Sequence, residues 1–344
     1  MSSIVSRRSE ARIPVWLLGL LGLEREPGEG ESISVNGLPF VMREGILRSC
    51  ELPTAAQGQT SDIFGYKWHR RETFESDAWL GHLRDWLVAR YGGFKWLDEF
   101  ADSPILLDAG CGAAASAIEL FGPMLNRVRY IGADISRAVD VARQRYLERA
   151  IEAGFIQTDL CRLPFAPGSI DIIFSEGVLH HTDSTEKALK SLAPLLRHGG
   201  KFLFYVYRRK GPIREFTDDF IRERIQGLSP QAAWQALVPL SRFGKLLGEM
   251  KIEIDVPEPI DLLEIPAGKI DLQRFFYWHV FKAFYHPEFS IDEMIHVNFD
   301  WYAPQNAHRQ SPEAVRQWCA DAGLEIERER VEEAGITIIA RKIR

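Results

Sequence analysis

Cysteine is scarce in this chain of 344 residues. The four cysteines, Cys50, Cys111, Cys161 and Cys319, stand far apart, and no two have the spacing of a zinc knuckle. A disulfide framework is also excluded, because a chain of this length builds a hydrophobic core without one. We therefore expect no metal site and a reducing compartment, the cytoplasm.

An excess of positive charge is missing as well. Lys and Arg number 42 against 48 Asp and Glu, which gives a net charge of −6. No overall basic field therefore draws the protein to nucleic acid, although a local basic groove stays open as an alternative. We expect a small-molecule partner and no nucleic acid.

Long hydrophobic runs are absent too, and the apolar stretch at residues 13–23 is too short to span a membrane. Arg7, Arg8 and Arg12 precede it, as in a signal peptide. An acidic segment at residues 24–29 then follows without a small-residue cleavage pattern. We interpret the stretch as a short helix that docks on the body of the protein.

The first hundred residues are interpreted as an N-terminal extension of the main domain. Asn36 and Gly37 tolerate the positive φ of a tight turn, so residues 33–42 are predicted to form a β-hairpin. A polar stretch at residues 54–62 leads into an aromatic segment at residues 64–68. The apolar spacing at residues 73–91 predicts an amphipathic helix.

Residues 101–207 alternate short apolar runs with helical patterns, which is typical of a parallel sheet covered by helices. Strands are expected at 105–109, 129–133, 154–158, 170–175 and 201–207, with helices at 137–153 and 184–197 and a helix C-cap at 198–200. Residues 311–323 predict a closing helix, and residues 324–331 and 336–342 a closing hairpin. The fold class is therefore α/β, with a Rossmann-like, doubly wound, mostly parallel sheet of seven strands.

The segment between residues 208 and 310 is too long for an ordinary connection. We interpret it as a mainly helical lid, inserted after the fifth strand, that binds the substrate. The chain then divides into residues 1–100, 101–207, 208–310 and 311–344.

A ligand-binding signature begins at the end of the strand at 105–109, in the sequence Asp-Ala-Gly-Cys-Gly at residues 108–112. Glycines are needed there because the chain turns sharply and a ligand approaches the backbone. Asp134 follows Gly112 by 22 residues at the next strand end, a separation at which a carboxylate can hold ribose hydroxyls. Asp159 ends a third strand and precedes Leu160, which can pack on an adenine ring. Three acids at three successive strand ends indicate one crevice.

These motifs occur in an order that resembles a known family. Residues 104–207 are similar to the core of class I S-adenosylmethionine-dependent methyltransferases, in particular the ubiquinone- and menaquinone-biosynthesis-like group. The resemblance rests on residues 106–112, 132–136, 158–165, 169–175, 176–182 and 196–201, and it departs at Ala114, where many relatives have a third glycine. It implies S-adenosyl-L-methionine as cofactor and the following binding residues: Trp68, Asp108, Ala109, Gly110, Gly112, Asp134, Ile135, Asp159, Leu160, Ser175, Glu176 and Gly177.

Two parts of the extension resemble modules found beside such cores. The block at residues 59–68 is similar to a segment that folds over the cofactor, where the π-face of Trp68 suits the sulfonium cation. The alternative is that Phe64 and Trp68 are ordinary core residues. The hairpin near Asn36 faintly resembles a zinc-ribbon-like module, but the cysteine pairs are missing, so no zinc is expected.

Methyl transfer needs mainly an aligned acceptor and, for some nucleophiles, a base. His180 and His181 follow the fourth strand and are candidates for that base, or they shape the pocket. Tyr205 and Tyr207 alternate onto one face of the fifth strand and are expected to line the acceptor site. In the insertion, His279, Tyr302 and His308 are the further substrate-binding candidates.

A metal site in the insertion is the alternative for its histidines. His296 and Asp300 would share one face of a helix, and His279, His286 or His308 could complete a ligand set. The scattered spacing favours an aromatic-lined lid instead.

The leading hypothesis is a methyltransferase that acts on an oxygen, nitrogen or carbon nucleophile of a small molecule, such as a glycoside, quinone, lipid-linked sugar or natural product. A nicotinamide-dependent oxidoreductase would share the sheet and the acidic residue that binds the ribose, but it would usually have a fuller glycine motif to bind the pyrophosphate. A scaffold or sensor that binds the cofactor without turnover is the third hypothesis. The sequence names neither the acceptor atom nor the oligomeric state.

Overall fold

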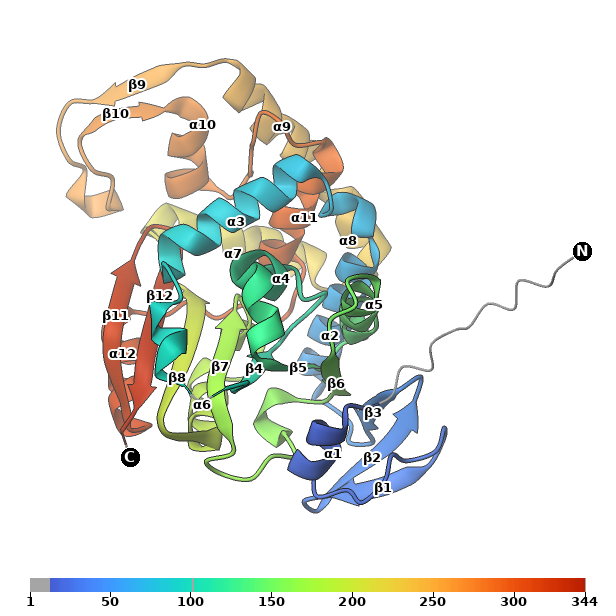
Figure 1. Ribbon diagram of the computed structural model, residues 1–344. Coiled ribbons are helices and arrows are strands. Elements are labelled where there is room, and N and C mark those ends of the chain that lie inside the picture. The colour runs from blue at the N-terminus through green and yellow to red at the C-terminus, as the bar shows by residue number, and fades with distance from the viewer. Residues whose placement is uncertain (1–12, 101, 344) are drawn as a thin grey trace, which may run out of the picture.

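A single mixed β-sheet organises the molecule in the computed structural model, which describes residues 13–100 and 102–343 (Figure 1). Its ten strands lie in the order β1-β2-β3-β6-β5-β4-β7-β8-β12-β11. The five pairings from β3 to β8 are parallel, and those at both edges are antiparallel. The strands are β1 (Ser32–Val35), β2 (Leu38–Arg43), β3 (Ile46–Ser49), β4 (Ile105–Ala109), β5 (Arg129–Asp134), β6 (Ala153–Gln157), β7 (Ile170–Glu176), β8 (Leu196–Tyr207), β11 (Leu324–Val331) and β12 (Gly335–Lys342).

Helices cover both faces of the sheet, as a doubly wound α/β fold requires. One face packs against α1 (Val15–Leu20), α6 (Thr185–Leu192) and α12 (Pro312–Asp321). The other packs against α3 (Asp77–Tyr91), α4 (Ala115–Phe121) and α5 (Ala138–Glu148). The central strands are buried on both faces, which explains their almost continuous apolar runs.

The N-terminal extension joins this sheet, so the prediction of seven strands was too low. The predicted hairpin is present as β1 and β2, with Asn36 and Gly37 at φ of 48° and 81°. β3 then pairs in parallel with β6, so that β1, β2 and β3 extend the seven expected strands to ten. The short predicted helix is α1, whose Leu17 is buried against Gly154 of β6; Arg7, Arg8 and Arg12 lie outside the described residues.

Several local predictions differ from the structure, among them the helix predicted at 137–153, which ends at Glu148. Residues 55–69 form a helix, α2 (Ala55–His69), where only a polar stretch and an aromatic block were recognised. The helix predicted from residue 73 begins at Asp77, because the Ser76 side chain accepts the Trp79 amide and caps it. Residues 198–200 are not a C-cap: α6 ends at Leu192, and β8 already begins at Leu196, with Gly199 at a φ of 79° where the pairing with β7 shifts register.

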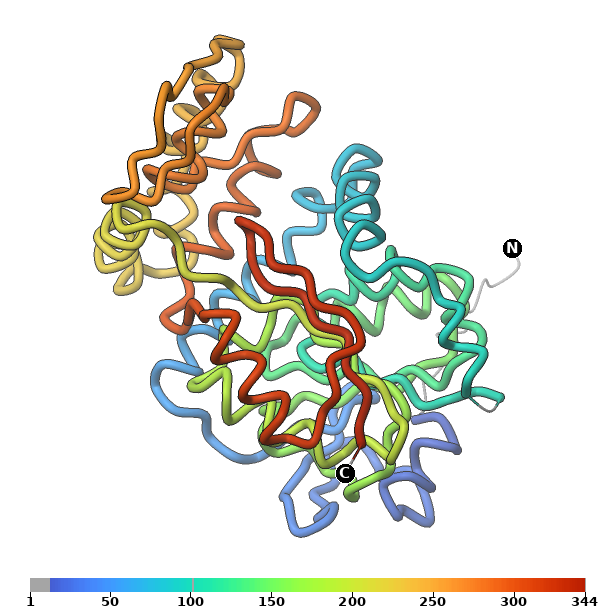
Figure 2. Tube along the Cα trace, turned by 90° about the vertical axis from the view of Figure 1, so that its left-hand side faces the viewer, coloured from blue at the N-terminus to red at the C-terminus, as the bar shows by residue number. Residues whose placement is uncertain are grey.

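The insertion between residues 208 and 310 lies beyond the carboxyl ends of the parallel strands, opposite β1 to β3 (Figures 1 and 2). It is mainly helical, as expected: α7 (Pro212–Ile225), α8 (Pro230–Ala236), α9 (Val238–Glu249), α10 (Leu272–Phe275), a π-helical turn (Phe276–Val280) and α11 (Ile291–Tyr302). A small hairpin of β9 (Glu253–Val256) and β10 (Gly268–Asp271) was not predicted. No helix in residues 13–100 or 102–343 is long and apolar enough to cross a membrane.

Candidate active site

The strand order reverses at β4, which lies between β5 and β7. In open α/β sheets such a switch point creates a crevice outside the carboxyl ends of the strands. A cavity of ≈ 280 Å³ lies here, and its lining includes Asp108 of β4, Asp134 of β5, Asp159 after β6 and Glu176 of β7. The structure therefore brings the acids of four successive strands to one wall, which we call the core wall.

The turn after β4 requires glycine at two positions. The amides of Gly110 and Cys111 both donate to the Ala133 carbonyl of β5, at 2.7 and 3.0 Å. Gly110 has a φ of 87°, and a Cβ there would lie 2.1 Å from a methyl of Val178; a Cβ on Gly112 would lie 2.7 Å from Trp68 Nε1. Ala114, the departure from the glycine pattern, keeps the left-handed backbone with a φ of 56°.

Asp134 holds this turn in place. Its carboxylate accepts the Gly112 amide at 2.8 Å, and the amide and hydroxyl of Ser136 at 2.7 and 2.6 Å. Burial raises the pKa of Asp134, although these hydrogen bonds oppose the shift. One lone pair on Oδ2 remains for a ligand hydroxyl, because that oxygen accepts only the Gly112 amide within the described chain.

Asp108 is buried in the core wall, and Glu176 is half-buried there. Asp108 accepts the Tyr130 hydroxyl at 2.6 Å, and burial raises its pKa to about 7. Glu176 accepts hydrogen bonds from the Tyr91 hydroxyl and, at 3.3 Å, from the Trp86 indole, and burial raises its pKa as well. A cationic ligand beside them would compensate their charge, because a buried carboxylate is costly without a partner.

Most of the predicted cofactor residues line the cavity, and two do not. Ser175 donates its hydroxyl to the Ala109 carbonyl at 2.8 Å, and both residues are fully buried behind the wall. They support the strand ends and cannot contact a ligand with their side chains. The predicted residues in the lining are Trp68, Asp108, Gly110, Gly112, Asp134, Ile135, Asp159, Leu160, Glu176 and Gly177.

The segment expected to cover the cofactor is part of α2. Trp68 lies over the glycine turn and meets the rings of Phe74 and His296 edge-on, with centroids 5.0 and 5.1 Å away. Lys67, next to it, forms an ion pair of 2.7 Å with Asp300. The Trp68 ring packs in an aromatic cluster and also lines the cavity, and its contact with the cofactor stays a prediction.

His296 and Asp300 do lie on one helix, α11, but each has its own partner. His296 Nδ1 is 2.8 Å from the Thr73 hydroxyl, and Asp300 pairs with Lys67. Within the described residues, no three His, Cys, Asp or Glu side chains are grouped to hold a metal ion.

The two histidines after β7 have different positions. His181 lines the cavity, and its Nδ1 lies 2.6 Å from the Asn306 carbonyl, so Nδ1 carries the proton and Nε2 presents its lone pair. That Nε2 is buried and has no partner among the described residues. His180 lies outside the lining: it stacks on Tyr207 at 3.6 Å, and its Nδ1 accepts the Tyr207 amide. Burial lowers the pKa of His181 to about 4 and that of His180 well below its usual range.

Of the predicted acceptor residues, Tyr205 and Tyr207 line the cavity. The three insertion residues do not. His279 packs beside Phe275, with centroids 5.4 Å apart, and the Tyr302 hydroxyl donates to Asp218 at 2.8 Å. His308 Nε2 lies 3.1 Å from the Thr182 carbonyl and faces a separate surface hollow.

The opposite side of the cavity comes from α2, the insertion and the loop before β12; we call it the insertion wall. It is aromatic, with Tyr277, Trp278, Phe284, Phe289 and Trp301, and it carries Lys67, Lys210, Arg214 and Lys282. None of the four cations was recognised in the sequence. They are separated by up to 215 residues, so no local spacing could have indicated them.

Comparison with known proteins agrees with the geometry of the core wall. Residues 107–204 match the family model described as "Methyltransferase domain". The matched core is thus a methyltransferase domain. The family and the Rossmann-like fold predicted from the motif series are thus confirmed, whereas the proposed domain boundaries remain a prediction.

Relatives of the methyltransferase domain match only part of this chain. The uncharacterized methyltransferase YcgJ of Bacillus subtilis is 30% identical over 142 residues, which cover 38% of this chain and 54% of YcgJ. The tRNA (carboxymethyluridine(34)-5-O)-methyltransferase alkbh8 of Xenopus tropicalis is 31% identical over 106 residues, or 30% of this chain and 16% of that protein. Among solved structures, magnesium protoporphyrin IX methyltransferase from Synechocystis has a TM-score of 0.45 and 17% identity, covering 83% of this chain and 99% of that one. The chain thus spans about half the length of YcgJ and much less of the tRNA enzyme.

Proposed function

We propose that this protein is a cytoplasmic methyltransferase that transfers the methyl group of S-adenosylmethionine to an oxygen, nitrogen or carbon nucleophile of a small molecule by in-line displacement. The observation that carries the proposal is the cavity at the switch point, with the acids of four strand ends on one side and an aromatic compartment on the other. The bound cofactor supplies an electrophilic methyl group on a sulfonium.

The core wall fits that cofactor in shape and charge. Gly110 and Gly112 leave the space that a Cβ would occupy, so a ligand can lie against the backbone. Asp134 offers its free lone pair to ribose hydroxyls, and Asp159 with Leu160 frames an adenine. Asp108 and Glu176 match the ammonium and sulfonium charges.

His181 is the chain's candidate for contact with the acceptor nucleophile. His181 lines the cavity and its neutral ring leaves Nε2 without a partner in the described chain, so a small shift of the buried ring would let Nε2 accept a hydrogen bond from an O–H or N–H group. A pKa of about 4 makes it a weak base. We therefore propose that His181 orients the nucleophile and does not deprotonate it, which requires a nucleophile that is itself fairly acidic. His180 is proposed to support β8.

The acceptor compartment favours a small molecule over a folded RNA. Tyr205 and Tyr207 line the cavity together with the aromatic residues of the insertion wall, and flat apolar ligands fill such aromatic-lined cavities well. Relatives named as tRNA methyltransferases make RNA the alternative that an experiment must separate.

Calorimetry and turnover test this proposal. S-adenosylhomocysteine should bind to the protein, and NADH should not; Asp134→Ala should abolish binding, whereas exposed Asp62→Ala on α2 should leave it intact. With tritium-labelled cofactor, a small-molecule extract should yield a labelled product that resists ribonuclease. Tighter binding of NADH would overturn the cofactor assignment, label in tRNA would overturn the acceptor class, and binding without any label transfer would favour a sensor.

A further inference from the structure

Within the described residues, two of the four cations of the insertion wall form an ion pair and two do not. Lys67 is paired with Asp300 at 2.7 Å, and Arg214 with Asp218 at 2.8 Å. Lys210 and Lys282 have no carboxylate within ion-pair distance in the part of the chain that is described. Lys210 Nζ donates to the carbonyls of Glu333 and Ala334, and Lys282 Nζ donates to the carbonyl of Val297 at 2.8 Å.

These lysines converge on one ring. The ammonium nitrogens of Lys210 and Lys282 lie 5.6 and 5.3 Å from the Trp301 ring centroid, and the Arg214 guanidinium carbon lies 5.6 Å from it. All four residues line the cavity. Trp301 also contacts Tyr207 of β8, with ring centroids 4.5 Å apart, so the cations lie close to the core sheet.

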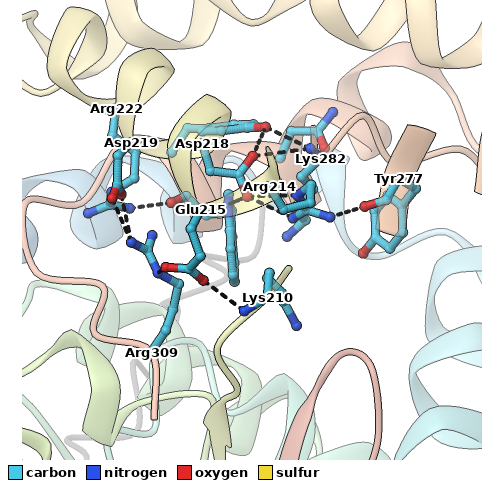
Figure 3. Close-up of polar contacts among 12 residues, drawn as sticks. Lys210, Arg214, Glu215, Asp218, Asp219, Arg222, Tyr277, Lys282 and Arg309 are labelled. Carbon is cyan, nitrogen blue, oxygen red and sulfur yellow. Dashed lines mark hydrogen bonds and ion pairs between the residues drawn. The ribbon is translucent and has the colours of Figure 1, made fainter. Parts of the chain in front are cut away.

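A fixed network holds this arrangement. Asp218 is fully buried and accepts hydrogen bonds from Arg214, the Trp301 indole and the Tyr302 hydroxyl, each at 2.8 Å. Figure 3 shows Arg214 between Asp218 and the Tyr277 carbonyl, with Lys210 and Lys282 on opposite sides of it. Asp218 forms its ion pair with Arg214, and neither lysine ammonium group lies within ion-pair distance of it.

Burial makes the unpaired charges costly. It lowers the pKa of both Lys210 and Lys282 to about 7. The charged groups that face Lys210 are Arg208, Arg214, Lys282 and Glu333; those that face Lys282 are Lys67, Arg214, Asp218 and Asp300. An anion bound near the two ammonium groups and Arg214 would favour the protonated forms of both lysines.

We propose that the methyl acceptor carries an anionic group, most simply a carboxylate, on a flat apolar body. Lys210 and Lys282 bind the anion beside Trp301, while Tyr205, Tyr207 and Trp278 enclose the body. This assignment rests on the proposed methyltransferase function. It adds that the acceptor is an organic acid, selected by two ammonium groups that lie opposite the acidic core wall.

Matched probes test the charge requirement. Naphthoate and naphthamide share one ring system, and only naphthoate is anionic; a panel of aryl carboxylates and their amides extends the pair. Calorimetry is done on the full chain with saturating S-adenosylhomocysteine, which keeps the cofactor's own carboxylate site filled. We expect the carboxylate to bind at least about tenfold more tightly than its amide. Its binding should also take up protons near pH 7, which a run in buffers of different ionisation heat will measure.

Variants then locate the site. Lys210→Met and Lys282→Met should each reduce the preference for the carboxylate and the proton uptake, whereas Lys245→Met, at a half-exposed position of α9 outside the cavity lining, should change neither. Equal affinity for carboxylate and amide throughout the panel would overturn the proposal, as would an unchanged preference in folded Met variants or displacement of the carboxylate by S-adenosylhomocysteine. If a Met variant fails to fold, the proposal is decided by the wild-type protein alone, from its preference for carboxylate over amide and from its proton uptake. Failure of S-adenosylhomocysteine to bind at all would instead overturn the proposed function.

Discussion

The two walls of the cavity are built in opposite ways. The core wall takes its acids from the ends of neighbouring strands, so four short sequence segments determine it. The insertion wall takes its cations from α2, α7 and the loops around α10 and β8, and one buried carboxylate, Asp218, holds several of its partners together. The difference teaches that the cofactor side is fixed by backbone geometry and the acceptor side by a tertiary network.

Asp218→Asn is expected to have the largest effect and to affect only the insertion wall. It leaves the Arg214 guanidinium buried without its counter-charge, which should lower the free energy of unfolding by about 3–5 kcal/mol. Urea denaturation measures this effect. Asp219→Asn is the matched control, because Asp219 is about half exposed on the same helix and should cost less than about 1 kcal/mol. Similar losses in both variants would contradict a dominant role for the buried network.

Gly110→Ala tests the backbone geometry of the core wall. The new Cβ would clash with Val178 at a positive φ, which should cost about 2–4 kcal/mol and abolish binding of S-adenosylhomocysteine. Gly122 also has a positive φ but open space around a Cβ. Gly122→Ala therefore measures the cost of the backbone strain without the steric clash. Retained cofactor binding in Gly110→Ala would show that the turn tolerates a side chain.

His181→Gln tests the core side of the cavity through the pH dependence of the free energy of unfolding. The folded-state pKa of about 4 lies below the ordinary value of 6.5, so the unfolded chain binds the proton more readily. The contribution of neutral His181 to the free energy of unfolding is therefore fully present above pH 6.5, and it is lost as the pH falls toward 4. Between pH 7 and 5 the loss should be about 2 kcal/mol, and His181→Gln should remove it.

Urea midpoints at several pH values measure that slope. His69→Gln, at an exposed position of α2, should leave the slope as it is in the wild type. An identical slope in wild type and His181→Gln would mean that His181 is not buried in its neutral form.

Ala114→Gly should have the smallest effect. Ala114 adopts a left-handed conformation that glycine reaches without strain, whereas glycine loses more backbone freedom on folding. The net change in unfolding free energy should be a stabilisation of at most about 1 kcal/mol. Ala117→Gly, inside α4, should destabilise by a similar amount, and thermal denaturation of the pair will show whether the signs differ.

The sequence predicted the parts of the molecule that local rules govern. Strand ends, the glycine turn and the spacing from Gly112 to Asp134 identified the core wall, because each is a property of one βα unit. The parallel pairing of β3 with β6 could not be predicted in this way, since it joins residues more than a hundred positions apart. α2 was missed because Gly58 and Gly65 and its polar face weaken the helical pattern.

The insertion wall was predicted only in its aromatic character. His279, Tyr302 and His308 were chosen by residue type, but the side chains turn to Phe275, Asp218 and the Thr182 carbonyl. Lys210 and Lys282 gave no signal, because a lysine in a sequence is usually an exposed residue. Tertiary packing, in which Trp301 of α11 meets Tyr207 of β8, leaves Lys282 buried and Lys210 half-buried beside Trp301.

The sheet also ends differently on its two sides, and this has a consequence for self-association. At one edge, β11 carries Glu325, Glu327, Arg328, Glu329 and Arg330, and a bulge between Ile326 and Arg328 interrupts its pairing. Charged side chains and bulges prevent an exposed strand from pairing with another chain. At the other edge β3 covers β6, and only the four-residue β1 is left open. We expect neither edge to serve as a template for fibre growth, so the sheet stays at ten strands even when molecules are crowded.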